Sequence, residues 1–110
     1  MELETAVVRL SALAQNSRLA VFRLLVQKGP AGMPAGEIAE HLGVAPNALS
    51  FHLKELSHAG LLTSRPEGRY IYYAPDFAAM NALLGFLTDN CCAGSPAAAE
   101  CTAPPVCDAC

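Results

Sequence analysis

The sequence predicts a mainly α-helical domain that carries one two-stranded β-hairpin. Up to residue 60, apolar residues recur at helical spacing in blocks that end at Gly or Pro. Between residues 61 and 73 the composition changes to β-branched and aromatic residues around a Pro-Glu-Gly sequence, which is typical of a hairpin. A strongly apolar block from residue 77 onward returns to helical composition.

Two helices are expected in residues 3–28. Residues 3–15 form the first, with apolar side chains at Leu3, Val7, Leu10, Leu13 and Ala14. Asn16 and Ser17 offer side-chain oxygens that can cap a second helix, Arg18–Lys28, and Gly29-Pro30 ends it.

A loop and two further helices follow. Residues 29–36 are rich in Gly, Pro and Ala and predict a loop, with Pro34 suited to the first turn of a short helix that Gly43 ends. Pro46 then opens a longer helix that stops at Gly60. In that helix one face carries Leu49, Leu53 and Leu56.

The hairpin is expected to pair residues 61–65 with residues 69–73 across Pro66-Glu67-Gly68. Asp76 then caps a last helix that runs to about Asn90. This helix is apolar nearly all round, so it must bury more than one face. In so small a domain, we expect a second copy of the protein to cover the remaining face.

This order of elements is that of a winged helix-turn-helix, a DNA-binding fold. Its second turn helix enters the major groove, and its hairpin lies along the backbone or the minor groove. On a helical wheel, the three leucines of the 46–60 helix lie on one side, His52 lies at the edge of that stripe, and the opposite side carries Asn47, Ser50, Phe51, Lys54 and His58. The predicted DNA-binding residues are Asn47, Ser50, Phe51, His52, Lys54, Arg65 and Arg69.

Each of these side chains has a chemistry that suits DNA. Asn47 and Ser50 can exchange hydrogen bonds with base edges or phosphates, and Lys54 can meet a phosphate. Phe51 is unusual on a solvated face but suits a thymine methyl group. The two arginines flank the hairpin turn and suit phosphate contacts. The alternative is an ordinary amphipathic helix with a solvated face.

The charge distribution agrees with a weakly basic DNA-binding body. Net charge is −3, but residues 1–75 hold 7 basic and 6 acidic side chains (+1), whereas residues 76–110 hold 4 acidic and no basic ones (−4). Non-specific DNA affinity should therefore be modest. The start of the chain lacks a secretory signal and no stretch has the length of a membrane span, so we expect a reducing cytoplasm and no membrane contact.

All five cysteines come after residue 90, at Cys91, Cys92, Cys101, Cys107 and Cys110. This divides the chain into a body, residues 1–90, and a cysteine-rich tail, residues 91–110, which we expect to stay flexible without a ligand. Because the body has no thiols and the count is odd, the cysteines predict thiol chemistry, free or metal-bound, rather than a disulfide framework. The three histidines form no evident ligand set.

Four motifs follow one another in residues 1–90: Asn16-Ser17-Arg18-Leu19, Ile38-Ala39-Glu40-His41-Leu42-Gly43, Leu49-Ser50-Phe51-His52-Leu53-Lys54-Glu55-Leu56, and Gly60-Leu61-Leu62 with Glu67-Gly68-Arg69. In these motifs and their order, residues 1–90 resemble the ArsR/SmtB metal-sensing repressors. The resemblance implies a homodimer formed through the first and last helices. It also implies that the unliganded dimer represses its operon and leaves the DNA when it binds a metal or metalloid.

The resemblance also implies where sensing occurs. Residues 33–37, which correspond to a Cys-Val-Cys arsenic site in the family, contain no cysteine. The last helix, where other members bind zinc, has Asp76 and Asp89 but no histidine. Cys91-Cys92 with a third downstream cysteine resembles the arsenite repressors that bind at the end of the last helix. Cys101 is the nearest third ligand, with Cys107 and Cys110 as competitors.

Thiolate chemistry fits As(III), and Sb(III) equally, because both ions are soft and prefer sulfur ligands. Two alternatives stay open. Cys107 and Cys110 form a Cys-x-x-Cys pair that, with other tail cysteines, can bind zinc or cadmium. The thiols can also oxidise to disulfides, although the negative end of a helix raises a thiol pKa and disfavours this.

Two other classes of protein remain as rivals to a DNA-binding sensor. An arsenate reductase or thiol oxidoreductase needs a positioned nucleophile and an anion cradle, but no basic residue follows Arg69, so we expect no enzyme. A cysteine-rich metal chaperone that binds no DNA disagrees with the winged-helix order of elements.

Overall fold

The computed structural model describes residues 1–89 of the 110-residue chain. This range forms α1 (Leu3–Leu13), α2 (Asn16–Lys28), β1 (Met33–Pro34), α3 (Ala35–Leu42), α4 (Pro46–His58), β2 (Leu62–Glu67), β3 (Tyr70–Pro75) and α5 (Phe77–Thr88). The predicted class, mainly α with a β-hairpin wing, is confirmed.

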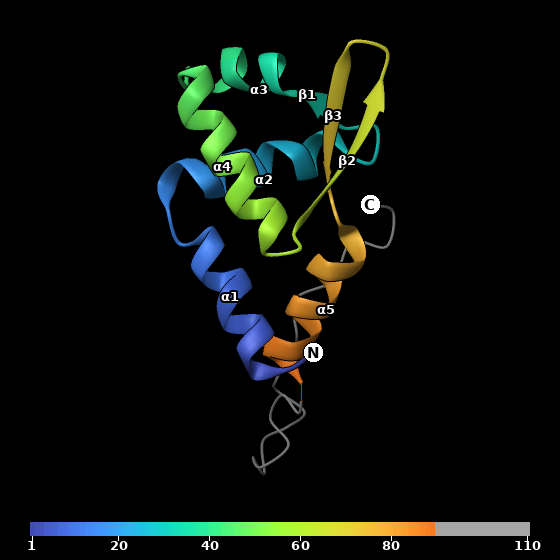
Figure 1. The fold of residues 1–110 in the computed structure, drawn as a ribbon. Coiled ribbons are helices and arrows are strands. Elements are labelled where there is room, and N and C mark those ends of the chain that lie inside the picture. Colours follow the sequence, from blue (N-terminus) through green and yellow to red (C-terminus); the bar gives the residue numbers. More distant parts are fainter. Residues whose placement is uncertain (90–110) are drawn as a thin grey trace.

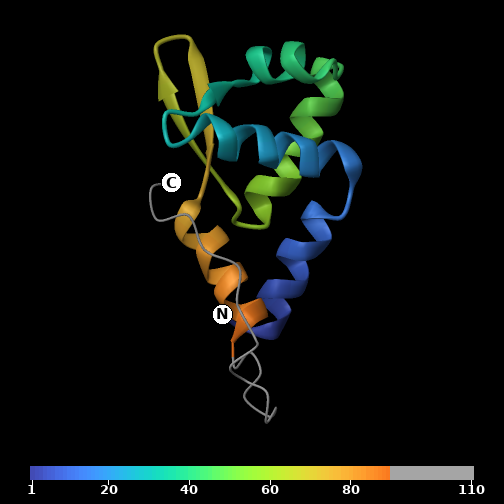
Figure 2. The same ribbon diagram turned by 180° about the vertical axis from the view of Figure 1, so that it is seen from behind.

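The helices are arranged around α2, which lies behind α4 in Figure 1 and in front of it in the reverse view of Figure 2. Helix α3 and the β-hairpin lie at one end of the molecule. Helices α1 and α5 approach each other at the opposite end. Helix α3 therefore lies beside the hairpin, and α4 runs from α3 toward the α1–α5 end (Figure 1).

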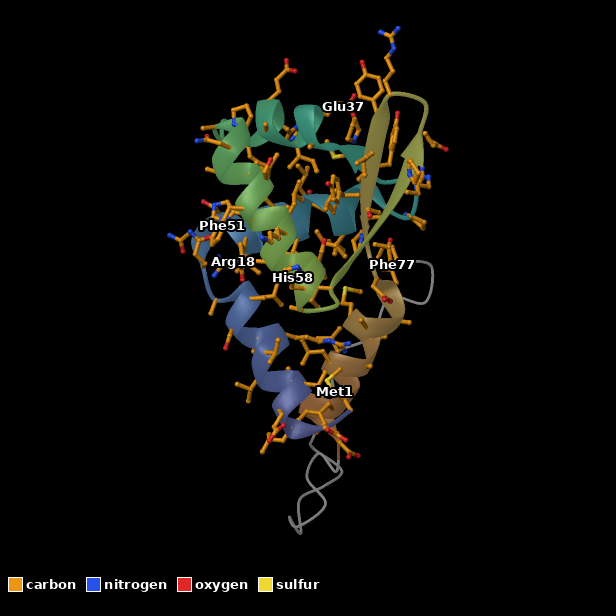
Figure 3. The ribbon with its side chains drawn as sticks, viewed as in Figure 1. Met1, Arg18, Glu37, Phe51, His58 and Phe77 are labelled. Atoms are coloured by element: carbon orange, nitrogen blue, oxygen red, sulfur yellow. The ribbon has the colours of Figure 1, made fainter. Side chains whose placement is uncertain are left out.

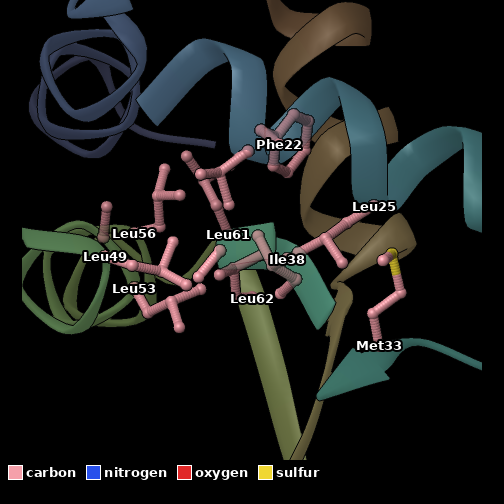
Figure 4. Packing of buried hydrophobic residues seen from close by; sticks show 12 residues of the cluster. Phe22, Leu25, Met33, Ile38, Leu49, Leu53, Leu56, Leu61 and Leu62 are labelled. Carbon is pink, nitrogen blue, oxygen red and sulfur yellow. The ribbon is translucent and has the colours of Figure 1, made fainter. Parts of the chain in front are cut away.

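The core lies where α2, α3 and α4 meet the start of β2. Its fully buried side chains include Val21, Leu25, Ile38, Leu49, Leu56 and Leu61. The leucine stripe predicted for α4 is confirmed: Leu49, Leu53 and Leu56 are 1%, 3% and 0% exposed and point into this cluster (Figure 4). Because these leucines are fixed in the core, the opposite face of α4 is held outward.

Helix α2 begins earlier than predicted. It starts at Asn16, and the capping side chain belongs to Gln15, whose Oε1 accepts a hydrogen bond from the Arg18 N–H at 2.8 Å. The prediction that Asn16 and Ser17 supply the cap was wrong, because the longer amide of Gln15 reaches the same backbone N–H from one position earlier.

The three strands form an antiparallel sheet in the order β1-β3-β2. Strand β1 was not predicted, because residues 29–36 have loop composition. Met33 and Pro34 become extended by pairing with Tyr73 and Tyr72, far along the chain. Pro34 is consequently the N-cap of α3 and does not lie in its first turn. Gly32 is required just before β1, because a Cβ there would lie 2.6 Å from the Tyr73 carbonyl oxygen.

The wing strands are longer than predicted. They run to Glu67 and resume at Tyr70, so the turn consists of Gly68 and Arg69, and Arg69 is not in a strand. Pro66 was assigned to the turn but pairs with Ile71 inside β2. Because β2 is the edge of the sheet, a residue without an N–H is tolerated there.

Helix α5 begins as predicted. The Asp76 side chain accepts a hydrogen bond from the Ala79 N–H at 3.0 Å, and the helix runs to Thr88. Among residues 1–89, none of the helices has both the length and the apolarity needed to cross a bilayer.

Candidate nucleic-acid interface

Helix α4 presents a polar face opposite its buried leucines. Pro46 opens the helix and leaves Ala45 as an extended N-cap. On the outward face, the exposed side chains are those of Asn47, Ser50, Phe51, Lys54 and His58. Figure 3 labels Phe51 and His58 along this outer side. The predicted division of α4 into a core side and an open side is confirmed.

The hydroxyl group of Ser50 donates its hydrogen bond within α4. Its Oγ donates to the carbonyl oxygen of Pro46 at 3.0 Å, one turn earlier in the helix. The hydroxyl lone pairs stay available, so in this rotamer Ser50 can accept a hydrogen bond from an amino group but cannot donate one outward. Cytosine N4 and adenine N6 carry such amino groups in the major groove.

Phe51 and His52 form an aromatic pair next to this face. Phe51 is 54% exposed, and its ring lies edge-on to His52 with ring centroids 5.9 Å apart. His52 is partly buried, and its Nδ1 is buried without a hydrogen-bond partner among the described residues. A hydrogen bond from His52 to DNA would therefore use Nε2. The position predicted for His52, at the edge of the apolar stripe, is confirmed.

The two wing arginines differ in what holds them. Arg65 donates from Nη2 to the carbonyl oxygen of Ala31 at 2.6 Å and lies 5.2 Å above the centre of the Tyr72 ring. It also forms an ion pair with Glu67 at 3.5 Å. Arg69 lies in the exposed turn at the tip of the wing. The structure thus ties Arg65 to the loop before β1, and places Arg69 where it can reach a phosphate.

A second exposed surface is apolar. We define the α1/α5 surface as the side chains of Leu3, Val7, Val8, Leu10, Leu84 and Leu87, which are 40–68% exposed. Only Ala6 of α1 and Ala79 and Leu83 of α5 are buried. A groove of about 420 Å³ adjoins this surface between α2 and α5, lined by residues that include Leu19, Phe22, Val26, Met80 and Leu84. The helical spacing of the apolar residues in α1 was predicted from the sequence. The spacing did not show that Leu3, Val7 and Leu10 are exposed in the single chain.

The predicted thiol ligands Cys91, Cys92 and Cys101 lie outside the described residues. Within residues 1–89, no group of three or more His, Cys, Asp or Glu side chains lies close enough to hold a metal ion. Of the seven predicted DNA-binding residues, five lie along α4 and two on the wing, as expected from the spacing.

Known proteins share this arrangement. A family model described as a helix-turn-helix domain matches residues 13–65. The nodulation protein NolR of Rhizobium meliloti is 35% identical over 86 residues, which cover 78% of this chain and 68% of that protein.

Two solved structures are similar over most of the chain. An ArsR-like transcriptional regulator from Rhodococcus sp. RHA1 has a TM-score of 0.68 at 28% identity, covering 76% of both chains. A homodimeric winged helix-turn-helix DNA-binding domain from Mycobacterium bovis, described as a possible ArsR-family regulator, has a TM-score of 0.63 at 30% identity, covering 80% of this chain and 82% of that one. With its helix-turn-helix body, its wing and these relatives, the chain belongs to the ArsR/SmtB type of winged helix-turn-helix transcriptional regulators.

Proposed function

We propose that this regulator is a homodimeric repressor that binds operator DNA without ligand and leaves it when Cys91, Cys92 and Cys101 bind As(III) or Sb(III). The observation that carries the DNA-binding part is the outward face of α4, which is fixed by buried leucines and carries exposed polar and cationic side chains.

Each half-site is read by one copy of α4 in the major groove. Asn47 and Ser50 are placed to contact base edges, and Phe51 is placed to contact a thymine methyl group. Lys54 on α4 and Arg69 at the wing tip contact phosphates. Few cations take part, so the salt dependence of binding should be shallow.

The dimer forms through the α1/α5 surface. Six large apolar side chains on two adjacent helices are exposed there, whereas Leu25, Leu61 and the three leucines of α4 are buried in the core of the single chain. A two-fold axis through such a surface pairs it with itself, and it leaves both copies of α4 free for two half-sites one helical turn apart. The homodimeric relative supports this proposal.

The sensing site is proposed from the chemistry of the tail. Cys91 comes three positions after Thr88, the last residue of α5, so only two residues of the sequence separate it from a helix on which the dimer depends. Cys101 is separated from Cys92 by eight residues, a loop whose closure costs little entropy beside strong thiolate bonds. Bound As(III) or Sb(III) changes how the two copies pair, and operator affinity falls. By linkage, operator DNA weakens metalloid affinity by the same factor.

The test starts from a random-sequence duplex library, from which the reduced protein selects its operator. Fluorescence anisotropy on the selected duplex is then titrated with arsenite, antimonyl tartrate, zinc, cadmium and hydrogen peroxide. We expect arsenite or antimonite to release the parent protein. Cys91→Ser, Cys92→Ser and Cys101→Ser should bind DNA normally and resist release, and the double variant Cys107→Ser/Cys110→Ser is the matched control that should still respond.

Other outcomes contradict specific parts of the proposal. Normal arsenite release of Cys91→Ser would remove the sensing assignment while leaving DNA binding intact. Release by zinc or cadmium that needs Cys107 and Cys110 would favour the Cys-x-x-Cys site, and release by peroxide would favour a redox sensor. If no duplex is selected, the DNA-binding part itself fails.

A further inference from the structure

The C-terminal end of α4 has a tightly defined cap. Gly60 has a φ of 80°, a left-handed conformation that favours glycine. Its N–H donates to the Ser57 carbonyl at 3.0 Å, and the Leu61 N–H donates to the Leu56 carbonyl at 3.1 Å. These two bonds form a Schellman motif, which ends the helix at a fixed angle.

The side chain of Arg9, on α1, completes this cap. Its Nε donates to the Ala59 carbonyl oxygen at 3.1 Å, in a partly buried position. The guanidinium also lies close against Gly60, since a Cβ added there would be 3.2 Å from Arg9 Nη2. A positive charge at the negative end of a helix dipole is stabilising, and a charged donor makes a stronger hydrogen bond than a neutral one.

Helix α5 is tied to the same short segment. The backbone N–H of Asp76, the N-cap residue of α5, donates to the Leu61 carbonyl at 2.8 Å. Residues 59–61 therefore accept one hydrogen bond from α1 and one from the start of α5. The two helices that carry the α1/α5 surface are both hydrogen-bonded to residues 59–61, which directly follow the helix proposed to read DNA.

We propose that Arg9 is a positioning residue that sets the angle between α4 and the α1–α5 pair, and so sets the operator half-site spacing that the dimer accepts. This inference rests on the proposed function, because it needs a dimer that reads two half-sites. The core fixes which face of α4 points outward. The hydrogen bond from Arg9 to Ala59 fixes the angle between α4 and the helices α1 and α5, which form the proposed dimer interface.

The experiment compares spacing preference with half-site affinity. Arg9→Met removes the hydrogen bond and the charge but keeps an apolar stem. Arg9→Lys keeps a cationic donor, and Lys28→Met, on the exposed end of α2, removes one positive charge elsewhere. Each protein is titrated against the selected operator, against duplexes whose half-sites are one or two base pairs closer or farther apart, and against a single half-site.

The expected result is a flattened spacing preference in Arg9→Met. The ratio of affinities for correct and altered spacing should fall about tenfold, the factor that loss of one hydrogen bond to a charged group gives. Single half-site affinity should stay near that of Lys28→Met, and Arg9→Lys should recover most of the preference. A loss of stability alone would lower all affinities together and leave the ratio unchanged.

An unchanged ratio in folded Arg9→Met overturns the inference, even if the proposed function holds. If Arg9→Met does not fold, Gly60→Ala is measured in the same series, because its methyl group presses on Nη2, and an unchanged ratio there overturns the inference equally. If the parent protein selects no operator, the proposed function has failed instead, so the two failures are distinguishable.

Discussion

The helix-turn-helix core and the α1/α5 surface have the same kind of apolar helical pattern. The core is buried within the single chain, whereas the α1/α5 surface is exposed in it. In the body, Leu25, Leu49 and Leu56 are at most 1% exposed within a single chain. On the α1/α5 surface, Leu3 and Leu87 are 68% and 55% exposed. A helical period thus identifies the residues that share a face, and it leaves open whether the same chain or a second copy covers that face.

The largest effect is expected from a charge placed on the α1/α5 surface. Leu87→Asp would bury a carboxylate twice in a two-fold interface, which costs several kcal/mol. The dimer should dissociate at micromolar concentrations, and operator affinity should fall at least a hundredfold because one copy reads only one half-site. Sedimentation equilibrium and anisotropy measure the two effects.

Ile71→Asp is the matched control for that change. The exposed fraction of Ile71 is 49%, similar to the 55% of Leu87, but Ile71 lies on β3 of the wing. It should leave the dimer intact. If Leu87→Asp remains as dimeric as Ile71→Asp, the α1/α5 surface is not the dimer interface, and a second copy does not explain its exposure.

The next largest effect tests the body. Leu56→Ala removes a side chain that is 0% exposed and should lower the free energy of unfolding by about 3 kcal/mol. Leu87→Ala should lower it less, and its effect should depend on protein concentration because it acts through the dimer. Urea denaturation at two concentrations separates the cases. Equal, concentration-independent losses would place Leu87 in a core of its own chain.

The sequence predicted the parts of the fold that depend on local chemistry. The end of α3 at Gly43, the start of α4 at Pro46 and the Asp76 cap of α5 agree with the structure, because each depends on side chains within a few positions. The outward face of α4 was also predicted, because three leucines at helical spacing are sufficient to orient it.

The remaining features depend on residues far apart in the chain. Strand β1 exists because Met33 pairs with Tyr73, and the tie between Arg9 and Ala59 spans 50 positions. Arg65 was predicted as a phosphate ligand from its place beside the turn, but a backbone carbonyl of the preceding loop competes for it. No spacing rule in the sequence reports such contacts.

A smaller effect is expected from the reading face of α4. Asn47→Ala should cost about 2 kcal/mol of operator binding and relax the base preference at one position in each half-site. Its control is Asn81→Ala, an exposed asparagine on α5. Selection from the random library, repeated with both variants, measures the change. A selected sequence unchanged by Asn47→Ala would remove this residue from the interface.

The smallest effect distinguishes the two wing arginines. Arg69 is exposed in the turn, whereas Arg65 is bonded to other residues of the same chain. Arg69→Ala should weaken binding to all sequences alike by about 1 kcal/mol and reduce the slope of log affinity against log salt by about 1 per half-site, because one phosphate contact is lost. Arg65→Ala should change the salt slope less and the stability of the wing more, since its guanidinium is bonded to Ala31 and stacked on Tyr72. Equal salt slopes for the two variants would mean that Arg65 leaves these partners for DNA, and that contacts within the chain do not decide which wing cation meets a phosphate.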